Sequence, residues 1–285
     1  MTTLTDFEVA QILSDSLKYV KLYRNHTVVV KYGGNAMKNP ECQRQVMHDL
    51  VLLQMIGVRI VLVHGGGPAI ARSLAAQAIP TQFVDGLRVT DNATMRVVQQ
   101  VLAGETNKDL VKLLNVEGGR AVGLCGLDAN LLTAKQERDD LGWVGHITDV
   151  NVDLVEDLLD QGYIPVIASV AGDDEGNSYN VNADTAAAAI AAKLNARRLI
   201  LMTDINGLMR NVKDPETLIS RLKVEEIEGL TKDGVISGGM IPKMACVVDA
   251  INGGVERVVL INGTLPHSIL VEMLTKGGIG TMVTR

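Results

Sequence analysis

Short apolar runs typical of strands alternate with helical stretches along most of the chain, and this alternation constrains the fold more than any other sequence feature. Residues 27–31 (Thr-Val-Val-Val-Lys) predict a buried strand, residues 40–56 a helix and residues 59–63 a second strand, before a helix that starts at Pro68. Two strand–helix units in succession imply a parallel sheet with right-handed crossovers. With only 3% aromatic residues, the core must be built from aliphatic side chains, as is usual for such a sheet.

The rest of the chain continues this pattern less regularly. The predicted helices cover residues 93–114, 153–160, 183–194, 241–251 and 267–274, and the predicted strands cover residues 121–124, 131–134, 144–148, 164–167, 199–202 and 258–261. The strands at 131–134 and 144–148 are expected to form a short antiparallel pair, on the side of the molecule where a substrate would bind. Residues 206–239, which contain Lys213, are the least regular and typical of a surface excursion or of a lid over a ligand. Without an internal repeat or a flexible linker, we expect an α/β three-layer sandwich whose lobes share one central, mainly parallel sheet.

The N-terminal stretch stands apart from this pattern. Residues 4–23 predict a helix, because the apolar residues from Phe7 to Val20 recur at near-helical spacing. This helix precedes the first strand, so it is an appendage that either packs on its own subunit or serves as an oligomerisation arm. We therefore divide the chain into an N-terminal helix, residues 1–24, and one domain, residues 25–285.

Charge and composition exclude several classes of function. The formal net charge is −6 and no stretch is strongly basic, so nucleic acid is not an expected partner. Cys42, Cys125 and Cys246 lie far apart without metal-ligand spacing, which indicates thiols of a reducing compartment and no protein-held metal. The sequence has no signal-peptide pattern and no apolar run long enough to span a bilayer, so we expect a soluble, cytoplasmic protein; a plastid form cut to its mature start would look the same.

Three glycine-rich turns suggest a site for an anion. Lys31-Tyr-Gly-Gly34 and His64-Gly-Gly-Gly67 follow strands, and Gly238-Gly239 precedes a helix. One such turn alone is a weak signal, but amides of several glycine turns that lead into helix N-termini favour an anionic ligand. Neither the motif G-x-x-x-x-G-K-[ST] nor a G-x-G-x-x-G after the first strand is present, which argues against a Walker-type ATPase and a dinucleotide dehydrogenase.

Charged and amide side chains lie next to these turns. Lys31 ends an apolar strand and Lys243 falls in the first turn of the helix after Gly239, and two cations near convergent amides suit a transferring phosphoryl group. The segment Tyr179-Asn-Val-Asn-Ala-Asp184 places two amides on one side of an extended stretch and a carboxylate at a helix start, where capping is the common alternative. Arg88 follows a turn and is either a surface ion pair or a two-point clamp for a substrate carboxylate.

In this order, these segments resemble the amino acid kinase family, and within it the group that acts on N-acetylglutamate, over nearly the whole chain from about Asn25. The matching motifs are Val-Lys-Tyr-Gly-Gly34, Val-His-Gly-Gly-Gly-Pro68, Gly-Leu-Arg-Val-Thr90, Asn-Val-Asn-Ala-Asp184, Leu-Met-Thr-Asp-Ile-Asn-Gly207 and Gly-Gly-Met-Ile-Pro-Lys243. The resemblance implies the amino acid kinase fold and transfer of the ATP γ-phosphoryl to the γ-carboxylate of N-acetyl-L-glutamate, the second step of arginine biosynthesis. It also implies that Mg²⁺ arrives with ATP, that an N-lobe of residues 25–180 binds acetylglutamate, and that a C-lobe of residues 181–285 binds ATP.

The resemblance assigns roles to individual residues. Those that would act on the transferring phosphoryl group are Lys31, Lys243 and Asp184, the last by orienting both lysines. Those that would contact phosphate oxygens or shape the turns around them are Gly33, Gly34, Gly65, Gly66 and Gly67, with Gly34 and Gly66 as amide donors. Those that would bind acetylglutamate are Arg88, on its α-carboxylate, and Gly65, Gly66, Asn180 and Asn182. The nucleotide half would include Asp204, Gly207 and Met240. The nucleophile is a carboxylate that is already ionised at neutral pH, so no general base is needed.

The N-terminal helix looks like the extension of arginine-inhibited, hexameric members of this group. The segment His267–Glu272, followed by Gly278–Met282, resembles their arginine-site signature. The resemblance therefore implies feedback inhibition by arginine, a hexamer built as a trimer of dimers, and the PII signalling protein as a partner that the family allows. The residues implied at the arginine site are Tyr19, His267, Glu272 and Gly280. The alternative for the N-terminal helix is that it packs on its own subunit. The alternative for the C-terminal segment is a strand and turn that close the sheet.

Two other functions stay open. One is another kinase of the family, acting on carbamate, aspartate, glutamate or UMP, and the combination of Arg88, Asn180 and Asn182 argues against it. The other is a catalytically silent nucleotide-sensing or partner-binding protein on the same fold. The complete set of lysines and aspartate assigned to phosphoryl transfer argues against that function.

Overall fold

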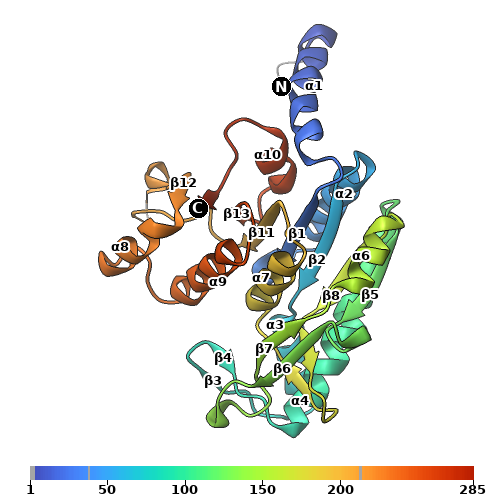
Figure 1. Ribbon diagram of the computed structural model, residues 1–285, viewed down its shortest axis with the longest axis vertical. Helices are drawn as coiled ribbons and strands as arrows, with labels where there is room; N and C mark the ends of the chain where they lie inside the picture. Colours follow the sequence, from blue (N-terminus) through green and yellow to red (C-terminus); the bar gives the residue numbers. More distant parts are fainter. Residues whose placement is uncertain (1–3, 38, 212–213) are drawn as a thin grey trace.

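The centre of the molecule is an eight-stranded sheet in the order β12-β14-β13-β11-β1-β2-β8-β5 (Figure 1). The computed structural model describes residues 4–37, 39–211 and 214–285, so the predicted lid residue Lys213 lies outside the described residues. The strands are β1 (Thr27–Tyr32), β2 (Arg59–His64), β5 (Ala121–Cys125), β8 (Ile164–Ala168), β11 (Arg198–Thr203), β12 (Arg221–Lys223), β13 (Val258–Asn262) and β14 (Thr281–Thr284). Every neighbouring pair is parallel except β13 and β14. The prediction of one continuous, mainly parallel sheet is confirmed.

Helices cover both faces of this sheet and complete the three predicted layers. They include α2 (Pro40–Met55), α3 (Gly67–Ala76), α5 (Asn107–Val116), α6 (Asp153–Asp160), α7 (Ala183–Lys193), α9 (Met240–Asn252) and α10 (Ser268–Leu274). On β1, Val28 and Val30 belong to a core with α2, α5 and α10, whereas Val29 belongs to the core of the opposite face, with α6, α7 and α9. A strand buried on both faces explains the unbroken valine run of β1. In the ranges that the structure describes, no helix is both long and apolar enough to cross a membrane.

A smaller sheet and a hairpin lie near the carboxyl ends of β1 and β2. The predicted antiparallel pair, β6 (Leu132–Gln136) and β7 (Gly145–Val150), is confirmed. It is joined by two strands that the sequence did not predict, β9 (Val170–Gly172) and β10 (Ser178–Asn180), in the order β10-β9-β6-β7. A further hairpin consists of β3 (Phe83–Val84) and β4 (Leu87–Arg88). Its turn, Asp85-Gly86, has φ values of 51° and 80°, and Asp-Gly is a dipeptide that tight hairpin turns favour, so this hairpin had a sequence signal.

The predicted helix 93–114 needs correction. It consists of α4 (Asn92–Gln99), a π-helix (Gln100–Thr106) and α5. A π-helix forms hydrogen bonds between residues five apart, and apolar periodicity over a long window does not resolve one such turn.

The prediction for residues 206–239 also needs correction, because this stretch is more than a surface excursion. Its strand β12 pairs in parallel with β14 and forms one edge of the central sheet. Leu222 of β12, together with Ile227 and Leu230 of α8 (Ile227–Lys232), is buried in the core. A strand of three residues is too short to show the period-2 alternation that predicts strands.

Helix α1 (Asp6–Tyr23) projects away from the body at its N-terminal end (Figure 1). Thr5 and Glu8 form a capping box that fixes the helix start. The C-terminal residue Tyr23 is buried in the core with α2 and α10, but Phe7 is 89% and Leu13 is 62% exposed. The predicted helix is therefore present, and most of its apolar side chains are not covered by its own subunit.

Candidate active site

A cavity of about 270 Å³ lies where β1 and β2 end and α7 begins. Ligands of open parallel sheets usually bind at the carboxyl ends of the strands. The predicted site residues that line the cavity are Lys31, Gly33, Gly34, Gly65, Gly66, Gly67, Arg88, Asn180, Asn182 and Asp184. Further lining residues, to which the sequence assigned no role, include Phe83, Gly86 and Leu87, from the β3–β4 hairpin, and Ser169. The fold thus brings segments from across the sequence to one cavity.

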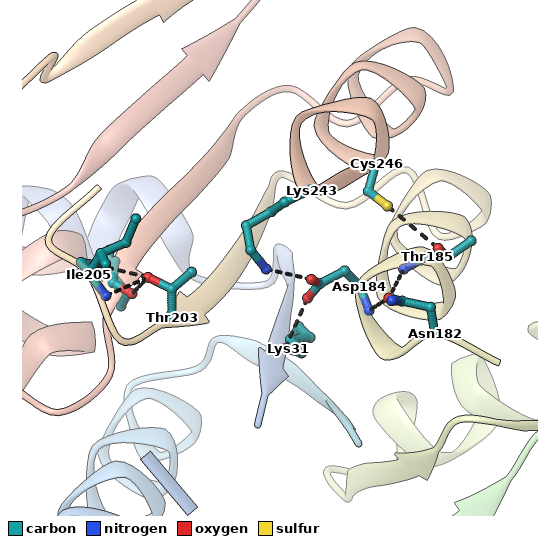
Figure 2. Close-up of polar contacts among 9 residues, drawn as sticks. Lys31, Asn182, Asp184, Thr185, Thr203, Ile205, Lys243 and Cys246 are labelled. Carbon is teal, nitrogen blue, oxygen red and sulfur yellow. Dashed lines mark hydrogen bonds and ion pairs between the residues drawn. The ribbon is translucent and has the colours of Figure 1, made fainter. Parts of the chain in front are cut away.

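Two lysines from different elements meet at one carboxylate beside this cavity (Figure 2). The Nζ atom of Lys31 lies 3.0 Å from Asp184 Oδ1, and the Nζ atom of Lys243 lies 2.5 Å from Asp184 Oδ2. Burial by itself raises the pKa of Asp184, but the positive charges of both lysines outweigh burial and hold that pKa below its ordinary value. Asp184 therefore stays ionised, and the cluster carries one net positive charge.

The start of α7 explains the position of Asp184. Asn182 is the N-cap residue, and its Oδ1 accepts hydrogen bonds from the backbone N–H groups of Asp184, at 2.8 Å, and Thr185, at 3.3 Å. Because the Asn182 oxygen caps the helix, its side chain can offer a ligand only its NH₂ group. Asn180, two residues earlier, also lines the cavity, and its Nδ2 donates to the hydroxyl of Thr90 at 3.1 Å. Both asparagines face one cavity, as their alternation predicts.

The two glycine turns after β1 and β2 bring the backbone to the cavity wall. Gly34 has a φ of 69°, in the left-handed region that glycine tolerates at no steric cost. Gly66 is the N-cap residue of α3, where a Cβ atom would lie 2.6 Å from Leu102 Cδ2. A side chain at Gly66 would therefore force the buried side chain of Leu102 to move. Amides at such a turn and at a helix N-terminus favour an anion.

Arg88 is buried in the cavity wall, with 8% of its surface exposed. Its Nη1 donates to the hydroxyl of Thr81 at 2.7 Å and its Nη2 to the carbonyl of Gly67 at 3.3 Å, while its guanidinium lies 4.6 Å from the centre of the Phe83 ring. Burial lowers the pKa of Arg88, yet a guanidinium stays charged at neutral pH. All of these partners are neutral, so the surface ion pair considered for Arg88 is wrong, and its charge faces the cavity without a carboxylate among these contacts.

The residues predicted for the nucleotide half do not line this cavity. Asp204 is exposed just after β11, and Met240 packs partly buried at the start of α9. Gly207 has a φ of 129°, and a Cβ atom there would lie 2.6 Å from Thr281 Oγ1, so close packing already requires glycine. The third glycine turn, Gly238-Gly239, is exposed before α9.

Within the described ranges, no three His, Cys, Asp or Glu side chains are grouped so that they could hold a metal ion. The three cysteines are free thiols. The Sγ of Cys246 lies 3.5 Å from the hydroxyl of Thr185, which places this thiol on α9 against the start of α7 (Figure 2).

A second cavity, of about 250 Å³, lies between the C-terminal end of α1, α10 and the turn before β14. Three residues predicted to bind arginine, Tyr19, Glu272 and Gly280, line it. His267 is not among the lining residues, and its Nδ1 lies 2.8 Å from Asp49 Oδ1 on α2. The charged lining residues are Arg198, Arg221, Arg257, Glu272 and Lys276, so the wall is mainly basic.

Comparison with known proteins identifies close sequence relatives. The model of the amino acid kinase family matches residues 26–262. The acetylglutamate kinase of Clostridium kluyveri is 49% identical over 278 residues, which cover 97% of this chain and 98% of that protein. The acetylglutamate kinase of Trichormus variabilis is 50% identical over 274 residues, which cover 96% of this chain and 92% of that protein.

Solved structures share the same fold. N-acetylglutamate synthase from Neisseria gonorrhoeae, complexed with coenzyme A and N-acetyl-glutamate, has a TM-score of 0.85 at 27% identity and covers 97% of this chain, which spans 63% of the synthase chain. The same synthase complexed with coenzyme A and L-arginine has a TM-score of 0.81 at 25% identity, over 96% of this chain and 65% of the synthase. Carbamate kinase from Giardia lamblia bound to AMP-PNP has a TM-score of 0.64 at 18% identity, over 92% of this chain and 99% of that chain. At this low identity, the likeness shows the fold alone.

Proposed function

The chain belongs to the amino acid kinase family and is an ATP-dependent kinase with a carboxyl group as acceptor; we propose that this acceptor is the γ-carboxylate of N-acetyl-L-glutamate. One arrangement carries the proposal. The lysine–aspartate–lysine cluster of Lys31, Asp184 and Lys243 borders a cavity that has the buried cation Arg88 in its wall. Such a cavity can hold a substrate with two carboxylates, one at each cationic site. The names of the sequence relatives support the same substrate.

The reaction brings two anions together, the acceptor carboxylate and the γ-phosphoryl group. Its catalysis is therefore mainly positioning and charge stabilisation. Lys31 and Lys243 place two positive charges against the one negative charge of Asp184, and the excess would stabilise the transferring group. The amides of Gly34 and Gly66 would donate hydrogen bonds to its oxygens. Mg²⁺ would enter as part of the ATP substrate and bridge its phosphates.

An assay of ADP release tests the acceptor. Each candidate is offered with ATP: N-acetyl-L-glutamate, glutamate, aspartate, carbamate and UMP. We expect turnover with N-acetyl-L-glutamate to exceed that with every other acceptor. A higher kcat/KM for one of the others would replace the proposed substrate, and no turnover with any would favour a nucleotide-sensing protein on this fold.

Replacing Arg88 by lysine is expected to raise the KM for acetylglutamate by about tenfold or more, because an ammonium group cannot reproduce a planar two-point clamp on a carboxylate. The KM for ATP should change little. Steady-state kinetics with each substrate varied in turn measure the two KM values. The matched control is Arg72→Lys, at an exposed position of α3. A fall in ATP affinity with unchanged acetylglutamate affinity would place Arg88 in the nucleotide half instead.

We further propose that arginine inhibits the enzyme by binding in the second cavity. Its basic wall suits the α-carboxylate of an amino acid, and in the described part of the chain the Nε of Arg198 is buried without a hydrogen-bond acceptor. Glu272 already accepts from Arg198 Nη1 and from the backbone N–H of Ile279, so a ligand guanidinium would have to share this carboxylate. The structure of a synthase with the same fold bound to L-arginine supports the proposal. Inhibition requires that arginine bind a less active conformation more tightly.

The N-terminal helix is proposed to exchange between neighbouring dimers and build a hexamer as a trimer of dimers. Its exposed apolar residues support this assembly, because a row of such side chains needs a partner to cover it. The exposed residues are Leu4, Phe7, Val9, Ile12, Leu13 and Leu17. Binding of the PII signalling protein stays a prediction, which size-exclusion chromatography of a mixture of the two proteins would test.

Deleting the residues before Arg24 should therefore give active dimers with weakened arginine inhibition. The deletion removes the arm and also three residues that line the second cavity, Tyr19, Leu22 and the buried Tyr23. Light scattering measures the assembly, and an arginine titration of turnover measures the response. A truncated enzyme that stays hexameric and fully sensitive to arginine would leave α1 as a cover for its own subunit.

A further inference from the structure

A chain of buried polar contacts runs beneath the second glycine turn. His64 ends β2 and Asn107 begins α5, and both residues are fully buried. The Nε2 of His64 lies 3.1 Å from the Nδ2 of Asn107, and its Nδ1 lies 2.9 Å from the carbonyl oxygen of Gly65. Buried polar groups at such a position need partners, and these contacts connect the start of α5 to the cavity wall.

The neighbours of Asn107 fix the orientation of its side-chain amide. Its Oδ1 accepts a hydrogen bond from the ammonium group of Lys108 at 3.1 Å. Its Nδ2 faces the backbone carbonyls of Leu124, at 3.1 Å, and Val166, at 2.9 Å. A flipped amide would set an NH₂ group against the ammonium and an oxygen against two carbonyls. The NH₂ group of Asn107 therefore lies on the side of His64 and shares its two hydrogens between the His64 Nε2 and the two carbonyls.

The amide orientation in turn fixes the tautomer of His64. A donor at Asn107 requires an unprotonated Nε2, so the proton of a neutral ring lies on Nδ1 and is donated to the carbonyl of Gly65. The second contact requires the same tautomer, since an unprotonated Nδ1 would set two acceptors 2.9 Å apart. Burial lowers the pKa of His64 to about 4, and the nearby charge of Lys108 acts in the same direction, so the ring stays neutral near pH 7.

The carbonyl of Gly65 and the N–H of Gly66 belong to one peptide group. No peptide bond in the described residues is cis, and in a trans peptide these two groups point in opposite directions. Because His64 holds the Gly65 carbonyl, the Gly66 N–H points away from the buried contacts of His64 and Asn107. In the described part of the molecule no protein acceptor is found for this N–H, and Gly66 lines the cavity. We infer that His64, held by Asn107, is a positioning residue that aims the Gly66 amide at the transferring phosphoryl group.

This inference rests on the proposed role of Gly66 in phosphoryl transfer, so the first test is independent of any substrate. Long-range ¹H–¹⁵N correlation spectra of the full-length protein distinguish the two neutral tautomers of histidine. We expect the His64 signal to report a proton on Nδ1 and none on Nε2 at pH values from about 6 to about 8. A proton on Nε2 would overturn the inference, whatever acceptor the enzyme uses.

The second test separates the two ring nitrogens by substitution. The side-chain nitrogen of asparagine can occupy the position of Nδ1, whereas the amide of glutamine reaches the position of Nε2. His64→Asn thus keeps a donor for the Gly65 carbonyl, and His64→Gln keeps only a partner for Asn107. We expect His64→Gln to lower kcat by about tenfold or more, with KM for acetylglutamate changed far less, because a misaimed amide stabilises the transition state less well. The His64→Asn variant should retain a kcat within about threefold of the unsubstituted enzyme.

Thermal unfolding of both variants is the control for folding, since each places an amide in the same buried position. Equal losses of kcat in two folded variants would mean that the donor to Gly65 is not what matters, and two fully active variants would mean that the turn needs no such support. Either result overturns the inference. Failure of the proposed substrate would look different, because the unsubstituted enzyme itself would then not turn over acetylglutamate. The same variant comparison would in that case be made with the acceptor that the enzyme does use.

Discussion

Alanine in place of Lys31 or of Lys243 is expected to lower kcat by about 10²-fold or more, because each change removes a charge that would stabilise the transferring phosphoryl group. Both ammonium groups contact the same carboxylate, so each variant leaves Asp184 with one partner and the cluster with no net charge. The binding of ground-state substrates should suffer less than the chemical step. Steady-state kinetics at saturating ATP and acetylglutamate measure the loss.

The control for this prediction is a lysine of α7 that has no part in the cluster. Lys193 is 52% exposed and lies 3.9 Å from Asp149, so Lys193→Ala should leave kcat unchanged. Circular dichroism and thermal unfolding show whether the active-site variants are folded. Near-normal turnover in either of the folded variants would remove that lysine from the proposed mechanism.

Much of this site could be predicted from the sequence because its signals are local. A charged residue that ends an apolar strand, as Lys31 does, has few reasons to be there other than a site at the strand end. The segment Asn182–Asp184 indicates a helix start from its own residues, without any distant partner. The structure places the capping Asn182 and the carboxylate of Asp184 at the cavity. The order of strands and helices follows from the same local patterns.

Features that depend on distant partners could not be predicted in the same way. The sequence shows His64 in a glycine-rich turn, but the amide that fixes its tautomer is 43 positions away, at the end of a π-helix. The edge strand β12 exists because β14 offers it a partner, and its three residues carry no pattern of their own. Glu272 was predicted only as a contact for a ligand, and its partner Arg198 lies 74 positions earlier.

The pair of Arg198 and Glu272 joins three parts of the C-terminal half. Arg198 begins β11 and Glu272 lies in α10, with side chains only 3% and 2% exposed. The Nη1 of Arg198 lies 3.1 Å from Glu272 Oε1, and Glu272 Oε2 accepts from the backbone N–H of Ile279 at 2.9 Å. The guanidinium also lies 5.0 Å from the centre of the Tyr23 ring, at the end of α1. A charge buried this deeply depends on its partner, because burial leaves it little contact with water.

Glu272→Gln is expected to lower the free energy of unfolding by about 3 to 5 kcal/mol, because it leaves the charge of Arg198 buried without a counter-charge. Urea unfolding of the variant and of the unsubstituted protein measures the difference. The matched control is the pair of Arg59 and Asp160, which are 2.9 Å apart but 32% and 66% exposed, so Asp160→Asn should cost less than about 1 kcal/mol.

The double variant Arg198→Met with Glu272→Leu distinguishes the effect of losing the ion pair from the effect of leaving one charge buried without its partner. Replacing a whole buried ion pair by apolar side chains of similar size is often close to neutral, so the double variant should recover most of the stability that Glu272→Gln loses. If instead the double variant were as unstable as the single one, the attraction between the two charges would itself be stabilising this half. If Glu272→Gln cost no more than Asp160→Asn, water from the neighbouring cavity would have to reach Arg198, and the pair would not be needed to hold α10 against β11.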